Sequence, residues 1–288
     1  VWNENVWLAA NGGGIGTYWG GVRSIGEKVK GAGQTSGIIP FIRVMDSLTL
    51  AISQGSLRRG SAAVYIDIWH PEIEEFLEIR KASGDFNRKG LNLHHGINVT
   101  DAFMEAVRDG TSFALRSPKT DEIVREIDAR QLWQRILETR LQTGEPYLLF
   151  IDAVNRALPK HQRELGLKVS TSNLCSEITL PTGIDHKDNE RTAVCCLASL
   201  NLETWDQWEG DEGLIEDVMR FLDNVITFFV ESAPDSMARA KYSAMRERSV
   251  GLGVMGFHSF LQANGIPFEI ALAKSWNFRS EVERQILA

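Results

Sequence analysis

The sequence predicts an α/β fold, because strand-like and helix-like segments alternate along one continuous body. Short runs of β-branched and aromatic residues are each followed by a stretch whose apolar residues recur every three or four positions. No internal repeat, low-complexity tract or Pro-rich linker interrupts the 288 residues. The composition, 43% hydrophobic and 24% charged, is typical of a globular chain with a large core.

Residues 62–84 form the clearest strand and helix pair. The run AAVYIDIW, residues 62–69, is rich in β-branched and aromatic residues and predicts a strand. Pro71 suits a first helical position, where no backbone N–H is needed, and Gly84 suits the end of a helix. The sequence therefore predicts a helix between these two residues.

The same alternation continues along the rest of the chain. HHGINV, residues 94–99, predicts a strand, and Asp101 is expected to cap the helix that follows. A helix around 132–141 precedes a strand that begins at Tyr147, and residues 214–229 keep helical spacing. The apolar residues of these helices are interpreted as core.

Charge and cysteine content exclude several classes of protein. A net charge of −7 argues against a broad nucleic-acid surface or a polybasic membrane surface, although local Arg and Lys could hold a small anion. The longest apolar runs, such as 225–230, are too short to cross a bilayer. Three Cys and no visible secretory signal favour a reducing, cytoplasmic setting. Because the chain begins at Val1 within dense sequence, we expect a piece of a longer protein.

The stretch SNLCSEITLPT, residues 172–182, places an amide, a thiol and a carboxylate at alternate positions. If this segment is extended, Asn173, Cys175 and Glu177 point to the same side and share one site. The alternative is that Cys175 is a small buried hydrophobe and that Glu177 reaches water.

Two Gly-rich loops suggest a nucleotide ligand. Glycines crowd residues 12–21, and the cations Arg23, Lys28 and Lys30 follow, which suits a phosphorylated ligand that approaches the backbone closely. The alternative is a flexible surface loop with solvated cations. A second loop, ISQGSLRRGSAA, carries Gln54 and Arg58, which can read a base edge and grip phosphate or stack on a ring.

Six segments occur in an order that resembles the catalytic (large, alpha) subunit of class I and class II ribonucleotide reductases. They are NGGGIG, GVRSIG, SQGSLRRGSAA, SNLCSEITLPT, AVCCLASLNL and AMRERSVGLGVMGF. The resemblance implies a partial ten-stranded α/β barrel with a central finger loop that carries the catalytic Cys. It further implies that residues 1–288 are an internal fragment of that barrel, without its N-terminal and C-terminal portions, from a truncation or a split gene.

The resemblance implies radical-based reduction of ribonucleotides to 2′-deoxyribonucleotides, for DNA replication. Cys175 would become the thiyl radical that takes the 3′ hydrogen of the ribose. Glu177 would act as general base on the 3′-hydroxyl, while Asn173 and Ser172 hold the substrate. Cys195 matches one of the two reducing cysteines that form a disulfide in each turnover, whereas Cys196 is interpreted as a buried structural thiol.

The resemblance also assigns nucleotide contacts to the Gly-rich loops. Gly14 would meet the substrate through its backbone, and Arg58 would join the substrate site. Arg23, Lys30 and Gln54 would bind a deoxynucleoside triphosphate effector that sets substrate specificity. Lys30 departs from family members that have Arg, so a point charge replaces a bidentate fork there.

Cofactor and partners depend on the class, and both classes stay open. A class I chain binds no cofactor directly and receives its radical from a metal-containing small subunit, whereas a class II chain uses adenosylcobalamin. Thioredoxin or glutaredoxin would supply electrons, and the complete protein would form a homodimer with diphosphate or triphosphate substrates. No nucleic acid, membrane or protein-bound metal is expected.

One absence and two alternatives complete the expectations. No Cys precedes Cys175, so Cys195 lacks its reducing partner and the fragment alone is expected to be inactive. A nucleotide-binding regulatory module without catalysis would use the cations but have no need for Cys175. A zinc-binding protein could use Cys175, Cys195 and Cys196 with His186, although their spacing suits zinc poorly.

Overall fold

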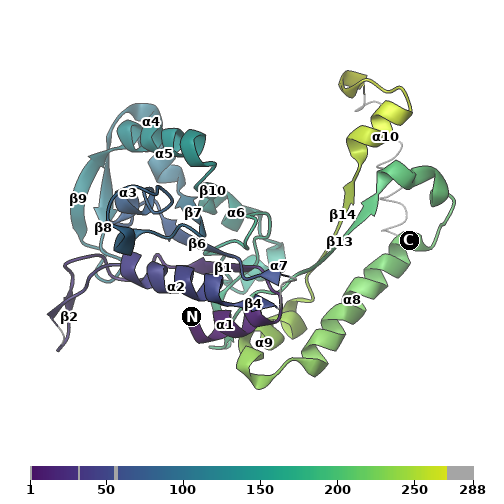
Figure 1. Ribbon diagram of the computed structural model, residues 1–288, viewed down its shortest axis with the longest axis horizontal. Coiled ribbons are helices and arrows are strands. Elements are labelled where there is room, and N and C mark those ends of the chain that lie inside the picture. The colour runs from purple at the N-terminus through teal and green to yellow at the C-terminus, as the bar shows by residue number, and fades with distance from the viewer. Residues whose placement is uncertain (1, 32, 55–57, 271–288) are drawn as a thin grey trace. The chain divides into compact units, whose positions relative to one another are not determined.

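The computed structural model describes residues 2–31, 33–54 and 58–270. Where the sequence predicts one body, the chain groups into two compact units, Val1–Glu190 and Arg191–Ala288, and each is described by itself (Figure 1). The placement of all 288 residues in one reductase barrel stays a prediction. Among the described helices, none combines the length and apolar character needed to cross a membrane.

The first unit is built on a parallel sheet of four strands in the order β1-β6-β7-β10 (Figure 1). The register aligns Gly16 with Ala63, and Gly96 with both Tyr65 and Tyr147. Parallel neighbours joined through helices confirm the predicted α/β class. The strands are β1 (Ile15–Tyr18), β6 (Ala62–Asp67), β7 (His94–Val99) and β10 (Tyr147–Phe150).

Helices pack on one side of this sheet, which we call the outer face. Val64, Ile66 and Ile97 point to it and form one core with apolar side chains of α2, α4 and α5. Burying each such side chain contributes about 1.5–3 kcal/mol. The helices of this unit are α1 (Trp2–Ala10), α2 (Ile39–Ala51), α3 (Ile73–Phe76), α4 (Asp101–Asp109), α5 (Ala129–Thr143), α6 (Ile151–Ala157) and α7 (Lys160–Glu164).

The opposite side of the sheet, the inner face, carries polar and aromatic side chains. Because side chains alternate along a strand, Tyr65 and Asp67 of β6 and Gly96 and Asn98 of β7 share this face. Every residue of β6 is buried, so both faces of the strand are covered, as is usual in parallel sheets. Residues 170–173 supply part of the inner cover.

Short antiparallel pairs extend from the first unit. β2 (Lys28–Val29) pairs with β3 (Gly33–Gln34), and β4 (Ser53–Gln54) pairs with β5 (Arg58–Arg59). A longer hairpin joins β8 (Ser112–Arg116) to β9 (Ile123–Asp128). β11 (Gly183–Ile184) and β12 (Glu190–Arg191) form a separate two-stranded sheet, and a 3₁₀ helix, η1, spans Phe86–Arg88.

Two predicted helix boundaries are wrong. The helix expected between Pro71 and Gly84 is only the short α3, because the chain after Phe76 continues in i→i+3 turns such as Glu78 N–H to Glu75 O. Asp101 is the first residue of α4 rather than its cap, since the Thr100 hydroxyl accepts the capping bond. The strands expected at 62–69, 94–99 and from Tyr147 are confirmed, as is the helix around 132–141.

The second unit pairs β13 (Cys196–Asn201) with β14 (Val250–Met255) in parallel. The predicted helix at 214–229 is confirmed as α8 (Leu214–Ser232), followed by α9 (Ala238–Glu247) and α10 (Phe257–Ala263). Buried Arg191 pairs with Glu247 and lies 5.7 Å from the ring centre of Tyr242. The 3₁₀ helices here are η2 (Leu202–Gln207), η3 (Asp235–Met237) and η4 (Phe268–Ile270).

Candidate functional site

The segment with the amide, thiol and carboxylate is a turn, which we call the Cys175 loop (residues 172–178). Leu174 and Cys175 form the turn, and Ser176 has a left-handed backbone with φ of 73°. The predicted extended alternation is therefore wrong. Cys175 and Glu177 are nonetheless both exposed, so the alternative of a buried structural Cys175 is also wrong.

Asn173 holds this loop closed. Its Oδ1 accepts hydrogen bonds from the backbone N–H groups of Glu177 and Ile178, both at 3.1 Å, and from Ser172 Oγ at 3.2 Å. Ser172 Oγ also bonds the Ile178 carbonyl at 2.7 Å. The amide thus replaces the backbone pairing that an extended strand would have made.

Gly14, just before β1, and Gly16, within β1, let the Cys175 loop lie directly on the inner face. A Cβ at Gly16 would stand 1.8 Å from the Ser172 carbonyl oxygen, and one at Gly14 would stand 2.9 Å from Leu174 Cδ2. Tyr65 Oη donates to the Asn173 carbonyl at 2.9 Å. Gly14, expected to meet substrate, therefore lies against the loop that carries Cys175.

Two tyrosines of the inner face lie close enough to Cys175 to interact with it electrostatically. Burial raises the pKa of Tyr65 to about 12, and Cys175 adds to the increase. Burial, Glu145 and Cys175 together raise the pKa of Tyr147. Cys175 is thus exposed beside two phenols that stay protonated at neutral pH.

A carboxylate orients the neighbouring histidines. Glu145 accepts from the His95 backbone N–H at 3.0 Å and from His95 Nδ1 at 2.9 Å, and it also bonds His94 Nδ1. Burial opposes ionisation, but these bonds outweigh it and lower the pKa of Glu145. The His94 ring stacks on Tyr147, with centroids 6.1 Å apart.

A polar triad lies on the inner face at the carboxyl ends of β1, β6 and β7, with Asp67 and Asn98 buried and Tyr18 half-buried. Tyr18 Oη donates to Asp67, and Asn98 Nδ2 donates to Asp67 at 3.1 Å and to the Ser170 carbonyl at 2.8 Å. Burial raises the pKa of Asp67, although both bonds oppose the increase. The triad ties the strands to the segment that leads into the Cys175 loop.

The cations expected to bind an effector lie on a Gly-rich loop, residues 22–38, which we call the hairpin loop because it contains β2 and β3. Arg23 is half-buried and Lys30 is exposed, and within the described residues neither forms an ion pair. Gln54 pairs with Arg58 through the backbone of β4 and β5. The side chains of Gln54 and Arg58, and residues 55–57 between them, lie outside the described part of the chain.

The two adjacent cysteines belong to the second unit. Cys196 begins β13, and the Cys195 thiol lies 3.9 Å from the Cys196 carbonyl oxygen. None of the three cysteines forms a disulfide. Cys196 is half-buried rather than buried as expected, and burial raises the pKa of its thiol.

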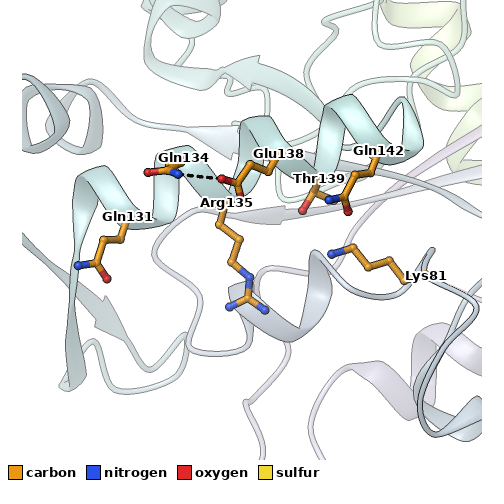
Figure 2. Close-up of a pocket in the computed structure, with 7 residues that line it drawn as sticks. All are labelled: Lys81, Gln131, Gln134, Arg135, Glu138, Thr139 and Gln142. Carbon is orange, nitrogen blue, oxygen red and sulfur yellow. Dashed lines mark hydrogen bonds between the residues drawn. The ribbon is translucent and has the colours of Figure 1, made fainter.

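A polar cavity of about 380 Å³ lies elsewhere, between α5 and the turn after α3 (Figure 2). Its cations are already engaged: Arg135 binds Glu74 and Glu78, and Lys81 binds Glu78. It is therefore not the candidate site. Within the described residues no cluster of three or more His, Cys, Asp or Glu could hold a metal, so the zinc alternative finds no ligand set there.

Sequence reasoning named the loop residues but missed their surroundings. The alternation of AAVYIDIW already places Tyr65 and Asp67 on one face of β6, which is the signal that could have found them. The glycines of β1 were noted, but as ligand contacts rather than as room for the Cys175 loop. No local signal pointed to Glu145, whose partners lie 50 and 51 residues away.

Comparisons with known proteins agree with one another. The family described as "Ribonucleotide reductase, barrel domain" matches residues 1–283. A ribonucleoside-diphosphate reductase large subunit of Invertebrate iridescent virus 3 is 40% identical over 93% of this chain and 49% of its own length. A frog virus 3 (isolate Goorha) protein, provisionally named as such a subunit, is 48% identical over 93% of this chain and 46% of its own length.

A solved structure extends the similarity to the fold. The alpha subunit of the Actinobacillus ureae class Id ribonucleotide reductase superposes with a TM-score of 0.79 at 32% identity. The match covers 99% of this chain and 49% of that one. The chain thus spans about half the length of these three proteins.

Proposed function

The chain belongs to the ribonucleotide reductase family, and we propose that it carries the residues that reduce a ribonucleotide to a 2′-deoxyribonucleotide. Its parallel sheet is part of an α/β barrel. The observation that supports the proposal most is the Cys175 loop, in which Asn173 closes a turn that leaves Cys175 and Glu177 exposed. We infer that this loop is the finger loop of the barrel.

Each exposed group has a task suited to its chemistry. With a radical delivered from outside the chain, the Cys175 thiyl takes the 3′ hydrogen of the ribose. Glu177 accepts the 3′-hydroxyl proton, because a carboxylate is a competent base at neutral pH. Asn173 Oδ1 is occupied by the loop itself, so its Nδ2 is the group left to donate to a substrate hydroxyl.

Reduction of the ribose also consumes two electrons and two protons, which two thiols must supply. The 2′-hydroxyl leaves as water, two thiols become a disulfide as they supply two electrons and their protons, and Cys175 returns a hydrogen to the 3′ carbon. Cys195 is our candidate for one of those thiols. Tyr65 and Tyr147 themselves stay uncharged beside Cys175 at neutral pH, because burial raises both their pKa values.

Nucleotide binding is divided between substrate and effector. Because the relatives are named for ribonucleoside diphosphates, we propose a diphosphate substrate held by Gly14, Ser172 and Arg58. Arg23, Lys30 and Gln54 would hold a deoxynucleoside triphosphate effector. Arg23 and Lys30 form no ion pair within the described residues, which leaves their charges available for phosphates.

The radical source and partners follow from the class. The solved neighbour is titled a class Id alpha subunit, which favours class I and a metal-containing small subunit over adenosylcobalamin. This chain would then need no resident cofactor. We propose a cytoplasmic enzyme, reduced by thioredoxin or glutaredoxin, that acts as a homodimer when complete.

Replacement of Cys175 tests the proposal. In the complete enzyme, Cys175→Ser should abolish deoxynucleotide formation and leave nucleotide binding unchanged, because Ser keeps the shape but holds its hydrogen more strongly. Cys196→Ser is the matched control and should keep most activity. Substantial reduction by the Cys175→Ser enzyme would remove Cys175 from the mechanism, whereas effector binding without activity in any radical system would favour the regulatory module.

A further inference from the structure

The turn that follows β6 holds the hairpin loop at three backbone positions. This turn, residues 69–72, has the sequence WHPE, and its His70 and Glu72 side chains are buried. Neither residue belongs to the Cys175 loop or carries a charge exposed to a ligand. We propose that His70 and Glu72 are positioning residues of the effector site, an inference that rests on the proposed effector role of Arg23 and Lys30.

Glu72 joins the two ends of the hairpin loop. Its Oε2 accepts from the Ile25 backbone N–H at 3.1 Å and from the Ile38 backbone N–H at 3.0 Å. Only 4% of Glu72 is exposed, so water cannot readily replace these bonds. A Cβ at Gly37, where φ is 83°, would stand 2.3 Å from Glu72 Oε1, so the carboxylate also requires glycine there.

His70 holds the residue before Arg23. Its Nδ1 accepts from the Glu72 backbone N–H at 3.1 Å, which leaves the proton on Nε2, and Nε2 donates to the Val22 carbonyl at 3.0 Å. Burial lowers the pKa of His70, and this supports the neutral tautomer. Both ring nitrogens are thereby used for backbone contacts.

A third residue, Glu27, supports the loop from within. Glu27 Oε1 accepts from the Ser24 backbone N–H at 2.9 Å and from Ser24 Oγ at 2.8 Å, while Oε2 accepts from Ser117 Oγ at 3.0 Å. Arg88 is 3.6 Å from Glu72 Oε1 and offsets part of the buried charge. The loop is therefore fixed at residues 22, 24, 25 and 38.

This arrangement prepares the loop for an anion. Arg23 lies between two fixed positions, and Lys30 lies on the hairpin whose ends Glu72 joins. A loop ordered before binding loses less conformational entropy when its ligand arrives, so affinity rises without a new contact to the ligand. Removing the acceptor should lower effector affinity although Glu72 itself never touches the nucleotide.

Two substitutions at Glu72 test this role in the full 288-residue chain. Glu72→Leu removes the acceptor, whereas Glu72→Gln keeps one carbonyl oxygen at the same place and guards against loss of folding. Glu74→Gln is the matched control, because Glu74 pairs with Arg125 and Arg135 instead of the loop. Calorimetry with dATP and dTTP measures affinity, and amide hydrogen exchange measures protection of Ile25 and Ile38.

The expected result is graded. Glu72→Leu should speed exchange at Ile25 and Ile38 and weaken nucleotide binding about ten-fold, Glu72→Gln should give a smaller change in both, and Glu74→Gln should change neither. If Arg23→Ala weakens binding while Glu72→Leu does not, the positioning role is overturned and the effector site stands. If the unchanged chain binds neither nucleotide, or Arg23→Ala has no effect, the effector site itself is overturned and the positioning role with it.

Discussion

Asn173→Ala should open the Cys175 loop without unfolding the protein. The substitution removes Asn173 Oδ1, a single atom that accepts three hydrogen bonds. These come from the backbone N–H groups of Glu177 and Ile178 and from Ser172 Oγ. A neutral hydrogen bond contributes about 0.5–1.5 kcal/mol net. Water can replace the bond at exposed Glu177, and Ser172 keeps its bond to the Ile178 carbonyl. The closed conformation of the loop should therefore lose about 2 kcal/mol of stability. This corresponds to a loop that is open about 30-fold more often.

Amide hydrogen exchange resolves this change residue by residue. Exchange at Glu177 and Ile178 should become faster in Asn173→Ala, while amides of β6 and β7 keep their protection. Asn264→Ala is the control, because Asn264 is an exposed Asn whose side chain bonds a helix carbonyl in the other unit, at 2.9 Å. Unchanged exchange at Glu177 and Ile178 would refute the role of Asn173 as the clamp of the loop.

Asn173→Asp separates the two roles of this residue. The carboxylate keeps an acceptor for the two backbone N–H groups, so loop protection should stay near that of the unchanged chain. It loses the Nδ2 donor that we assign to the substrate, so activity of the complete enzyme should fall. Loss of loop protection together with activity would mean that the acceptor alone does not close the loop.

Three further predictions concern binding, pH and turnover. Arg23→Ala should weaken deoxynucleoside triphosphate binding by about 2 kcal/mol, as measured by calorimetry, because a charge-assisted contact is lost. Bonds from His94 and His95 lower the folded-state pKa of Glu145 below its ordinary 4.5, so its stabilisation is present above that pH and is lost as pH falls. Urea midpoints between about pH 6 and pH 3 should therefore fall more steeply in the unchanged chain than in Glu145→Gln. The 288-residue chain alone should give no multiple turnovers in a chromatographic assay, because its only cysteines besides Cys175 are the adjacent pair Cys195 and Cys196; repeated turnover would contradict this.

The sequence predicted the strands well because their signal is local. β7 begins and ends where HHGINV predicted, and β6 covers most of AAVYIDIW. The roles of Asn173, Cys175 and Glu177 stay predictions, but these three could be named as candidate site residues, since they stand in a distinctive segment. Their conformation could not, because the Asn173 side chain binds the backbone four and five residues ahead and bends a segment whose pattern is extended.

The features that the sequence could not predict are mostly contacts between segments that are distant along the chain. The bonds from Glu72 to Ile25 and Ile38 join residues 47 and 34 positions apart. The side chains of Ile25 and Ile38 give no sign of these contacts, because each residue bonds Glu72 through its backbone N–H. A pattern of residue types carries no information about such pairs until the fold places them together.

The glycine side of β1 has a consequence for the order of folding. The Ser172 carbonyl oxygen lies so close to Gly16 that no side chain would fit there, yet the two residues are separated by most of the first unit. Contacts of such long sequence separation form slowly, because the intervening chain must first be ordered. We therefore expect the sheet and its outer helices to assemble first and the Cys175 loop to reach its place last. A nascent or partly folded chain would then hold Cys175 away from the barrel until the surrounding structure is complete.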